Sequence, residues 1–164
     1  MKKILLAKKI YLIISNSCWK TKVQYLLSKF SRIRYKGFYE NYSRTKILDI
    51  MIVDDETDLV LLFEEFLSLI GHRVIDKAFD GEEAIEKYIK MPLQPNLIIM
   101  DHRMPKKDGL MTTKELLKIN PNLQIIILSA DSRIKNDFLS LGVTDFIEKP
   151  ISLSNLKKIL EDLK

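Results

Sequence analysis

Five short apolar runs recur along residues 46–164, and segments with a helical spacing of apolar residues separate them. Near-continuous apolar runs of this length are typical of β-strands that are buried on both faces. A strand followed by a helix, five times over, predicts an α/β domain with a parallel sheet, and right-handed crossovers then place helices on both faces. The expected strands are residues 46–53, 72–75, 96–100, 123–128 and 143–147.

The segments between these runs carry signals of helix ends. Asp80 precedes Glu83 by three residues, which is the spacing of a capping box, and Ser152 can cap a last helix. Gly71 and Gly142 stand where glycine commonly ends a helix. The apolar residues with helical spacing fall within residues 59–70, 84–89, 110–119, 134–141 and 153–163.

The charge of the chain changes sign near residue 45. Residues 1–45 contain eleven lysines and arginines and one acid, which gives +10. The whole chain has 27 basic and 22 acidic residues, so residues 46–164 hold 16 and 21 and carry −5. This break predicts two parts, a basic N-terminal extension of residues 1–45 and a globular domain of residues 46–164.

The cysteine count and the lengths of the apolar runs indicate where in the cell the protein is expected. Cys18 is the single cysteine, so an internal disulfide is excluded and a reducing, cytoplasmic location is expected. No apolar run approaches the roughly 18 to 20 residues that a membrane-spanning helix needs. The sequence therefore predicts a non-membrane domain with a basic appendage.

Polar side chains stand at the ends of four of the expected strands. Asp54 and Asp55 follow the first strand, Asp101 follows the third, Ser129 follows the fourth, and Lys149 comes shortly after the fifth. In an open parallel sheet the carboxyl ends of the strands lie at one edge, and ligands bind there. We therefore expect these five side chains to converge.

Such a set of side chains has a specific chemical use. Carboxylates packed closely repel each other, which raises the pKa of at least one of them unless a cation intervenes. Mg²⁺ prefers hard oxygen ligands, and a carboxylate can accept a phosphoryl group. The Lys149 ammonium and the Ser129 hydroxyl would then contact phosphoryl oxygens. The pattern predicts a phosphorylatable carboxylate beside a divalent cation.

Several motifs of the domain occur together and in a fixed order. They are Val53-Asp54-Asp55-Glu56, Asp101 with Met104-Pro105 and Asp108-Gly109, Leu128-Ser129-Ala130, and Phe146 three residues before Lys149-Pro150. With these motifs, residues 46–164 resemble the receiver domain of two-component response regulators, the CheY-like family. The resemblance implies a flavodoxin-like, doubly wound fold with a five-stranded parallel sheet in the order 2-1-3-4-5.

The resemblance also implies roles at the site. Asp101 would be the phosphoacceptor, and Lys149 would contact the phosphoryl group. Mg²⁺ would be the cofactor, bound by the Asp54, Asp55 and Asp101 side chains, with Asp54 acting largely through water, and by the backbone carbonyl of Arg103. The residues expected to act on the phosphoryl group are Asp101, Lys149 and Ser129.

Two residues would form a switch. Ser129 would move toward the phosphoryl oxygens, and Phe146 would swing inward behind it, so that phosphorylation shifts the population between two arrangements. A histidine kinase or a phosphotransfer protein would supply the phosphoryl group, and an unknown downstream protein would bind the charged form. Little chain follows the last helix, so a stand-alone receiver is expected. It would catalyse only its own phosphorylation and dephosphorylation, and its oligomeric state stays open, with a phosphorylation-dependent dimer as one alternative.

Competing functions are weaker or confined to the extension. A haloacid dehalogenase-type phosphatase needs a second acid two residues after its nucleophile, but Arg103 stands at that position. A nucleotide-binding protein needs a glycine-rich phosphate loop after the first strand, and this sequence has none there. Residues 1–45 could be a disordered tail or partly helical, because apolar residues at Val23, Leu26, Leu27, Phe30 and Ile33 suit one face of a basic helix. Nucleic-acid or membrane binding through this extension is therefore the alternative function.

Two further expectations concern residues near the site. Arg103 and Asp131 stand two residues after the acceptor and two after Ser129, so their opposite charges could pair over the phosphoryl group and slow its hydrolysis. His72 and His102 have no metal-ligand spacing and are interpreted as surface or rim residues.

Overall fold

The computed structural model describes residues 46–163. The expectations for residues 1–45, including a partly helical extension that binds nucleic acid or membrane, lie outside the described residues. The described chain falls into two compact units, residues 47–149 and the segment from residue 150 onward. The first unit holds the whole sheet and every expected site residue.

Strands and helices alternate along the described chain, as the sequence predicts. The elements are β1 (Asp49–Val53), α3 (Thr57–Leu69), β2 (Arg73–Ala78), α4 (Gly81–Lys90), β3 (Leu97–Asp101), α5 (Gly109–Ile119), β4 (Gln124–Ser129), the short 3₁₀ turn η1 (Ser132–Ile134), α6 (Lys135–Ser140), β5 (Asp145–Glu148) and α7 (Leu153–Asp162).

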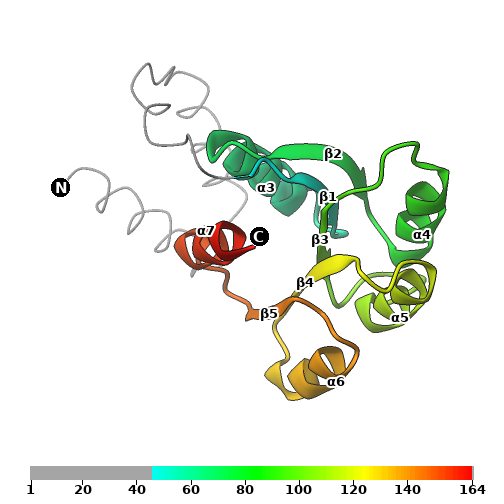
Figure 1. The fold of residues 1–164 in the computed structure, drawn as a ribbon. Helices are drawn as coiled ribbons and strands as arrows, with labels where there is room; N and C mark the ends of the chain where they lie inside the picture. Colours follow the sequence, from blue (N-terminus) through cyan, green and yellow to red (C-terminus); the bar gives the residue numbers. More distant parts are fainter. Residues whose placement is uncertain (1–45, 164) are drawn as a thin grey trace. The chain divides into compact units, whose positions relative to one another are not determined.

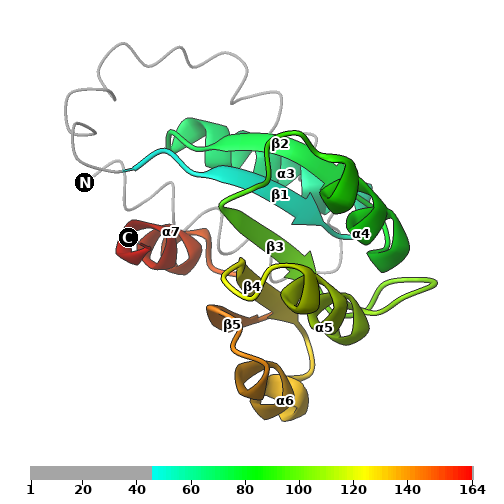
Figure 2. The ribbon, with the colours of Figure 1, turned by 45° about the vertical axis from the view of Figure 1, so that its right-hand side comes forward.

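The five strands form one parallel sheet in the order β2-β1-β3-β4-β5 (Figures 1 and 2), which confirms the flavodoxin-like topology. The register aligns the carboxyl ends of the strands. Val53 pairs with Met100, Asp101 pairs with Leu128, and Ser129 lies opposite Glu148. Residues that end β1, β3, β4 and β5 therefore meet at one edge of the sheet.

Helices of the first unit cover both faces of the sheet. Figures 1 and 2 show α3 on the side opposite α4 and α5. One apolar layer joins alternate residues of the strands, such as Met51 and Ile98, to Tyr88 of α4, Leu116 of α5 and Phe138 of α6. These side chains are buried, and each stabilises the fold by about 1.5–3 kcal/mol relative to exposure. The near-continuous apolar strands are thus explained by burial on both sides.

The helix ends largely follow the predicted signals. The Asp80 carboxylate caps α4 by accepting a hydrogen bond of 2.8 Å from the Glu83 N–H. Gly71 and Gly142 have positive φ angles of 90° and 86°, as expected of glycines that end helices. Asp108 adds a cap that is not among the predicted helix signals, because its carboxylate accepts a hydrogen bond from Met111 N–H at the start of α5.

Strand β2 is longer than the sequence predicts. The expected strand stops at Ile75, whereas β2 continues to Ala78 through Asp76 and Lys77. The pairing register with β1 shifts at this point, which leaves Ile75 without a partner in β1. Charged residues are depleted in strands, so the apolar pattern ends before the strand does.

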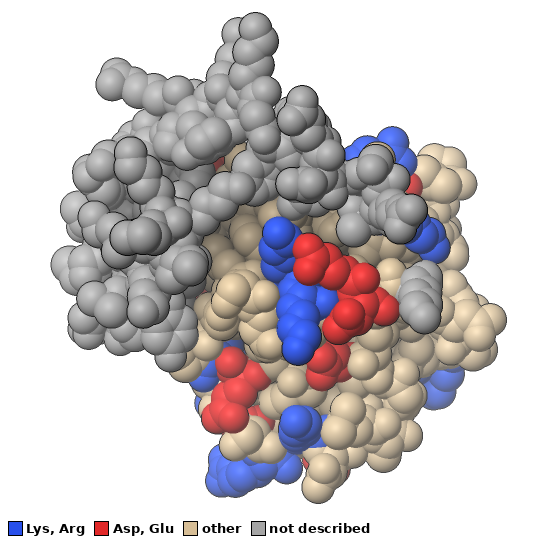
Figure 3. Space-filling view, turned by 60° about the vertical axis from the view of Figure 1, so that its left-hand side comes forward, with Lys and Arg blue, Asp and Glu red and all other residues tan. Residues whose placement is uncertain are grey.

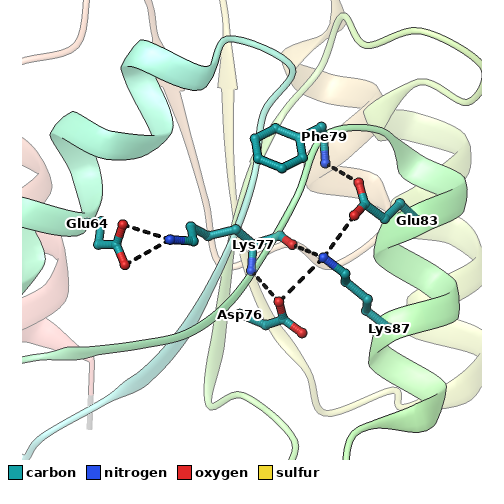
Figure 4. Close-up of polar contacts among 6 residues, drawn as sticks. All are labelled: Glu64, Asp76, Lys77, Phe79, Glu83 and Lys87. Atoms are coloured by element: carbon teal, nitrogen blue, oxygen red, sulfur yellow. Dashed lines mark hydrogen bonds and ion pairs between the residues drawn. The ribbon is translucent and has the colours of Figure 1, made fainter.

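Side chains of α3 and α4 support these charged residues at the sheet edge (Figure 4). The Lys77 ammonium contacts both carboxylate oxygens of Glu64, at 3.0 and 2.8 Å. The Lys87 ammonium lies 2.8 Å from Glu83 and 3.6 Å from Asp76. Asp76 and Lys77 can therefore occupy a strand because neighbouring helices supply opposite charges.

The outer backbone groups of β2 are also bonded to side chains. The Ala78 carbonyl points toward β1 and accepts a hydrogen bond from Asp54 N–H. Because the direction of backbone groups alternates along a strand, those of Lys77 and Phe79 point away from β1, to the outer side of the sheet. Lys87 Nζ donates to the Lys77 carbonyl at 2.7 Å, and Glu83 accepts from Phe79 N–H at 2.8 Å (Figure 4). Lys77 N–H donates to the Asp76 carboxylate at 2.7 Å. We call these three hydrogen bonds the β2 edge seal. Without them, the outer backbone groups of an edge strand can pair with a strand of another molecule.

The remaining described features concern α7 and the surface. Ser152 caps α7 by accepting from Asn155 N–H at 3.4 Å, as predicted, and Leu156 and Leu160 are buried. Acidic and basic side chains lie beside one another on the face drawn in Figure 3. Among residues 46–163, no helix is long and apolar enough to cross a membrane.

Candidate functional site

The parallel register brings the expected site residues to one sheet edge. Asp54 follows β1 directly, Asp101 ends β3, Ser129 ends β4, and Lys149 comes directly after β5. Backbone hydrogen bonds continue the pairing here, since Lys149 N–H donates to the Ser129 carbonyl at 2.8 Å. These bonds hold Lys149 beside the ends of the neighbouring strands.

Two carboxylates and one ammonium form the centre of the site. Lys149 Nζ lies 2.6 Å from Asp101 Oδ1 and 3.5 Å from Asp54 Oδ2. The Asp54 and Asp101 side chains are almost completely buried, at 1% and 6% exposure, and the Lys149 side chain is 22% exposed. The structure thus brings together the acids and the amine that the sequence placed at separate strand ends.

Burial raises the pKa of Asp54 to about 6, and the nearby Asp101 charge adds to this effect. The Lys149 ammonium and the N–H of Glu56, which donates to Asp54 Oδ1 at 2.9 Å, oppose the rise only in part. Burial alone would lower the pKa of Lys149, but the charges of Asp54 and Asp101 outweigh it and raise that pKa. The raised carboxylate pKa that the sequence predicts is therefore found at Asp54, with burial as its main cause and the charge of Asp101 as a smaller one.

The Asp101 carboxylate is oriented by the chain that follows it. Asp101 Oδ2 accepts a hydrogen bond of 2.7 Å from Arg103 N–H. His102 N–H donates to the Leu128 carbonyl, and Gly109 N–H donates to the His102 carbonyl. A Cβ atom on Gly109 would lie 2.4 Å from the Asp101 carbonyl oxygen, so only glycine permits this close approach.

The donor set suits a magnesium ion. Asp55 is exposed and makes no hydrogen bond or ion pair with another residue in 46–163, so its carboxylate is available as a ligand. No three His, Cys, Asp or Glu side chains in this range are arranged as a metal cluster, and the Lys149 ammonium already contacts the Asp54 and Asp101 carboxylates. Mg²⁺ commonly uses one or two carboxylates and keeps several waters, so these oxygens fit it.

Ser129 is close to this centre but bonded elsewhere. Its side chain is buried, and Ser129 Oγ accepts a hydrogen bond of 3.1 Å from Asp131 N–H. Ser129 Oγ also lies 3.5 Å from His102 Nδ1. Within the described residues, no hydrogen bond joins the Ser129 hydroxyl to Asp101 or Lys149, so the hydroxyl would have to move to meet a phosphoryl group.

Phe146 of β5 lies inside the apolar layer and is 6% exposed. Its ring centroid is 6.0 Å from that of Phe138 in α6. The structure therefore holds Phe146 in an inward position while Ser129 remains bonded away from Asp101. Phe146 is thus already in the position into which it was expected to swing, and the movement of Ser129 on phosphorylation stays a prediction.

Two neighbours of the site differ from the expectations. Arg103 lies 3.2 Å from Asp131, as hypothesised, but Asp131 also binds Arg133 at 2.7 Å, a partner the sequence analysis does not include. The His102 ring is not a simple rim group, because it contacts Phe138 edge-on at 5.5 Å between centroids and lies beside Ser129. No spacing rule in the sequence indicates this contact, which depends on the placement of α6.

Comparison with known proteins agrees with this geometry. The sequence profile of the family described as "Response regulator receiver domain" matches residues 50–161. The chemotaxis protein CheY of Thermotoga maritima is 34% identical over 113 residues, which cover 68% of this chain and 92% of the relative. A protein-glutamate methylesterase/protein-glutamine glutaminase of Archaeoglobus fulgidus is 30% identical over 118 residues, covering 70% of this chain and 33% of the relative.

Solved structures show the same fold. The crystal structure of a CheX–CheY–BeF₃–Mg²⁺ complex from Borrelia burgdorferi matches with a TM-score of 0.66 and 28% identity, and the match covers 71% of this chain and 87% of that chain. That structure contains Mg²⁺, and its receiver is bound to CheX. With the strand order, the converging site and these relatives, the chain belongs to the response regulator receiver domain family, the CheY-like phosphoacceptors of two-component signalling.

Proposed function

We propose that Asp101 accepts a phosphoryl group from a histidine kinase or a phosphotransfer protein, and that the resulting form signals by binding another protein. The observation that carries this proposal is the buried Asp101 carboxylate, held between Lys149 Nζ at 2.6 Å and Arg103 N–H at 2.7 Å. A carboxylate fixed on both oxygens is oriented before a donor arrives, which lowers the entropic cost of transfer.

The transfer itself needs little from the protein beyond position and charge. An Asp101 oxygen forms a bond to phosphorus while the phosphorus–nitrogen bond of the donor histidine breaks, and the departing nitrogen keeps the electron pair. The Lys149 ammonium, released from its ion pair with Asp101, neutralises the charge of one phosphoryl oxygen. The Ser129 hydroxyl donates a hydrogen bond to another phosphoryl oxygen.

Mg²⁺ is the proposed cofactor, and it supplies positive charge beside the phosphoryl oxygens. The Asp54, Asp55 and Asp101 side chains and the Arg103 carbonyl would hold it. The raised pKa of Asp54 supports this assignment, because a buried carboxylate that is costly to ionise gains stability when a cation is bound beside it.

Signal output rests on two residues of the switch. Ser129 exchanges its present bonds for the phosphoryl oxygens, and Phe146 holds the inward position that favours this arrangement. The protein would act in the cytoplasm as a receiver that turns over no external substrate, and a phosphorylation-dependent dimer is one form of its output.

A second candidate function rests on the charge of residues 1–45, which is +10. This basic extension would add nucleic-acid or anionic-membrane binding to the receiver. Salt-sensitive binding of the full chain to duplex DNA or to anionic vesicles, lost on deletion of residues 1–45, would support it. Equal binding by the deleted chain would contradict it.

Labelling with a small phosphodonor tests the main proposal. We expect the protein, incubated with acetyl phosphate and Mg²⁺, to gain the mass of one phosphoryl group, and Asp101→Asn to gain none. Asp137→Asn, on the exposed side of α6, is the matched control and should be labelled like the wild type. Labelling of Asp101→Asn to the wild-type level would contradict the assignment of Asp101.

A further inference from the structure

The two ends of the His102 side chain contact different parts of the first unit. On one side, His102 Nδ1 lies 3.5 Å from Ser129 Oγ. On the other, the ring packs edge-on against Phe138, with 5.5 Å between ring centroids. His102 is held in this place by its own backbone, since its N–H donates to Leu128 and its carbonyl accepts from Gly109 N–H.

Phe138 is the anchor of helix α6. It is completely buried, and it is the buried residue of this six-residue helix. Its ring contacts His102 on one side and lies 6.0 Å from the ring of Phe146. A short helix held by one buried side chain responds strongly to whatever packs against that side chain, because few other contacts fix it.

The contact between His102 and Ser129 is weak enough to be replaced. A separation of 3.5 Å is at the outer limit of a hydrogen bond. A phosphoryl oxygen on Asp101 is a charged acceptor, and hydrogen bonds to charged groups are stronger than those between neutral groups. Phosphorylation would therefore draw Ser129 away from His102 and leave the ring free to shift against Phe138.

We propose that His102 is a positioning residue that couples Ser129 to helix α6. Together with Asp131 N–H, which donates to Ser129 Oγ at 3.1 Å, it holds the Ser129 hydroxyl in the unphosphorylated protein, and it transmits the release of that hydroxyl to Phe138. This inference rests on the proposed phosphorylation of Asp101. It assigns to His102 a role that needs both ends of the side chain, the Nδ1 atom toward Ser129 and the ring toward Phe138.

Two substitutions separate the two ends of His102. His102→Phe keeps an aromatic ring against Phe138 and removes the nitrogen that contacts Ser129. His102→Asn keeps a polar atom near the position of Nδ1 and removes the ring. Asn136→Ala, on the exposed side of α6, is the matched control.

Hydrogen exchange of the α6 amides, measured with and without acetyl phosphate and Mg²⁺, provides the test. In the wild type and in Asn136→Ala, we expect phosphorylation to change the exchange rate of α6 by about two- to tenfold, the range that one ordinary hydrogen bond contributes. In His102→Phe, α6 should exchange as in the resting wild type but not respond to phosphorylation. In His102→Asn, α6 should exchange faster at rest and also not respond.

The outcomes separate the coupling from the proposed function. A wild-type response in His102→Phe would show that the ring is only a packing group, which overturns the coupling. A wild type that is phosphorylated without any change at α6 overturns it as well. Failure of the wild type to take up the phosphoryl group, followed in parallel by intact mass, contradicts the proposed function instead.

Discussion

The Lys149 ammonium lies 2.6 Å from the Asp101 carboxylate and 3.5 Å from that of Asp54, so one cation serves two buried acids. Removing this ammonium would leave two carboxylates facing each other in a buried site. Besides its proposed contact with a phosphoryl group, Lys149 therefore stabilises the folded protein when no metal is bound.

Substitution of Lys149 by Met should destabilise the metal-free protein at pH 8. We expect a loss of about 1–3 kcal/mol, less than for a fully buried pair because the Lys149 side chain is partly exposed. Urea denaturation with EDTA measures this loss, and Mg²⁺ should restore part of it. Lys135→Met, at an exposed position of α6, is the control and should change little. Equal stability of both variants would contradict the shared ion pair.

The raised pKa of Asp54 predicts a pH dependence of stability. The pKa rises from 3.8 to about 6 on folding, so the stability linked to this group is complete below about pH 4 and is lost as the pH rises through 6. A difference of about two pKa units corresponds to up to about 3 kcal/mol. Without metal, Asp54→Asn should therefore gain stability relative to the wild type between about pH 4 and 7. Parallel pH profiles of the two proteins would reject this assignment.

The Arg103–Asp131 pair predicts a long-lived phosphoryl group. Arg103→Ala should lose its phosphoryl group faster than the wild type, because the pair no longer hinders the attacking water. Arg133→Ala is the matched control, since Arg133 binds the same carboxylate at 2.7 Å but does not follow the acceptor in the chain. The decay of the phosphorylated protein by intact mass measures both. An unchanged lifetime in Arg103→Ala rejects the idea.

The β2 edge seal predicts resistance to self-association. Lys87→Ala removes the donor to the Lys77 carbonyl and one partner of Glu83, which exposes the outer groups of an edge strand. We expect this variant to associate at lower concentration than the wild type in size-exclusion chromatography. Lys90→Ala should stay like the wild type, because it removes a lysine of the same helix whose one partner among residues 46–163 is the exposed Glu86.

Gly109→Ala should damage both the fold and the site. The new Cβ would lie 2.4 Å from the Asp101 carbonyl oxygen, so β3 and the start of α5 must separate. We expect a loss of about 1–3 kcal/mol, the usual range for overpacking, and weaker labelling of Asp101. Gly142→Ala is a useful comparison, because its Cβ meets nothing within 4 Å and only the φ angle of 86° opposes it. A cost of about 1 kcal/mol is expected there.

The sequence predicts the parts of the fold that depend on local pattern. Buried strands such as Leu97–Asp101 and the cap at Asp80 follow from apolar runs and short-range spacing, and the strand ends then locate Asp54, Asp101 and Lys149. The end of β2 and the position of His102 could not be predicted in this way. Lys77 is tolerated in a strand because Glu64 of α3 is near, and His102 contacts Ser129 and Phe138 through the packing of three elements.

The charges at the carboxyl ends of the strands, around Asp101, have a consequence for ion selectivity. If Asp55 joins Asp54 and Asp101 as a ligand, as we propose, three carboxylates would face the ammonium of Lys149, and the ionised site would carry two unbalanced negative charges. A divalent ion makes it electroneutral, whereas sodium or potassium leaves one charge uncompensated. Cellular alkali salts should therefore compete poorly for this position despite their large excess, and the resting pocket should remain responsive to magnesium.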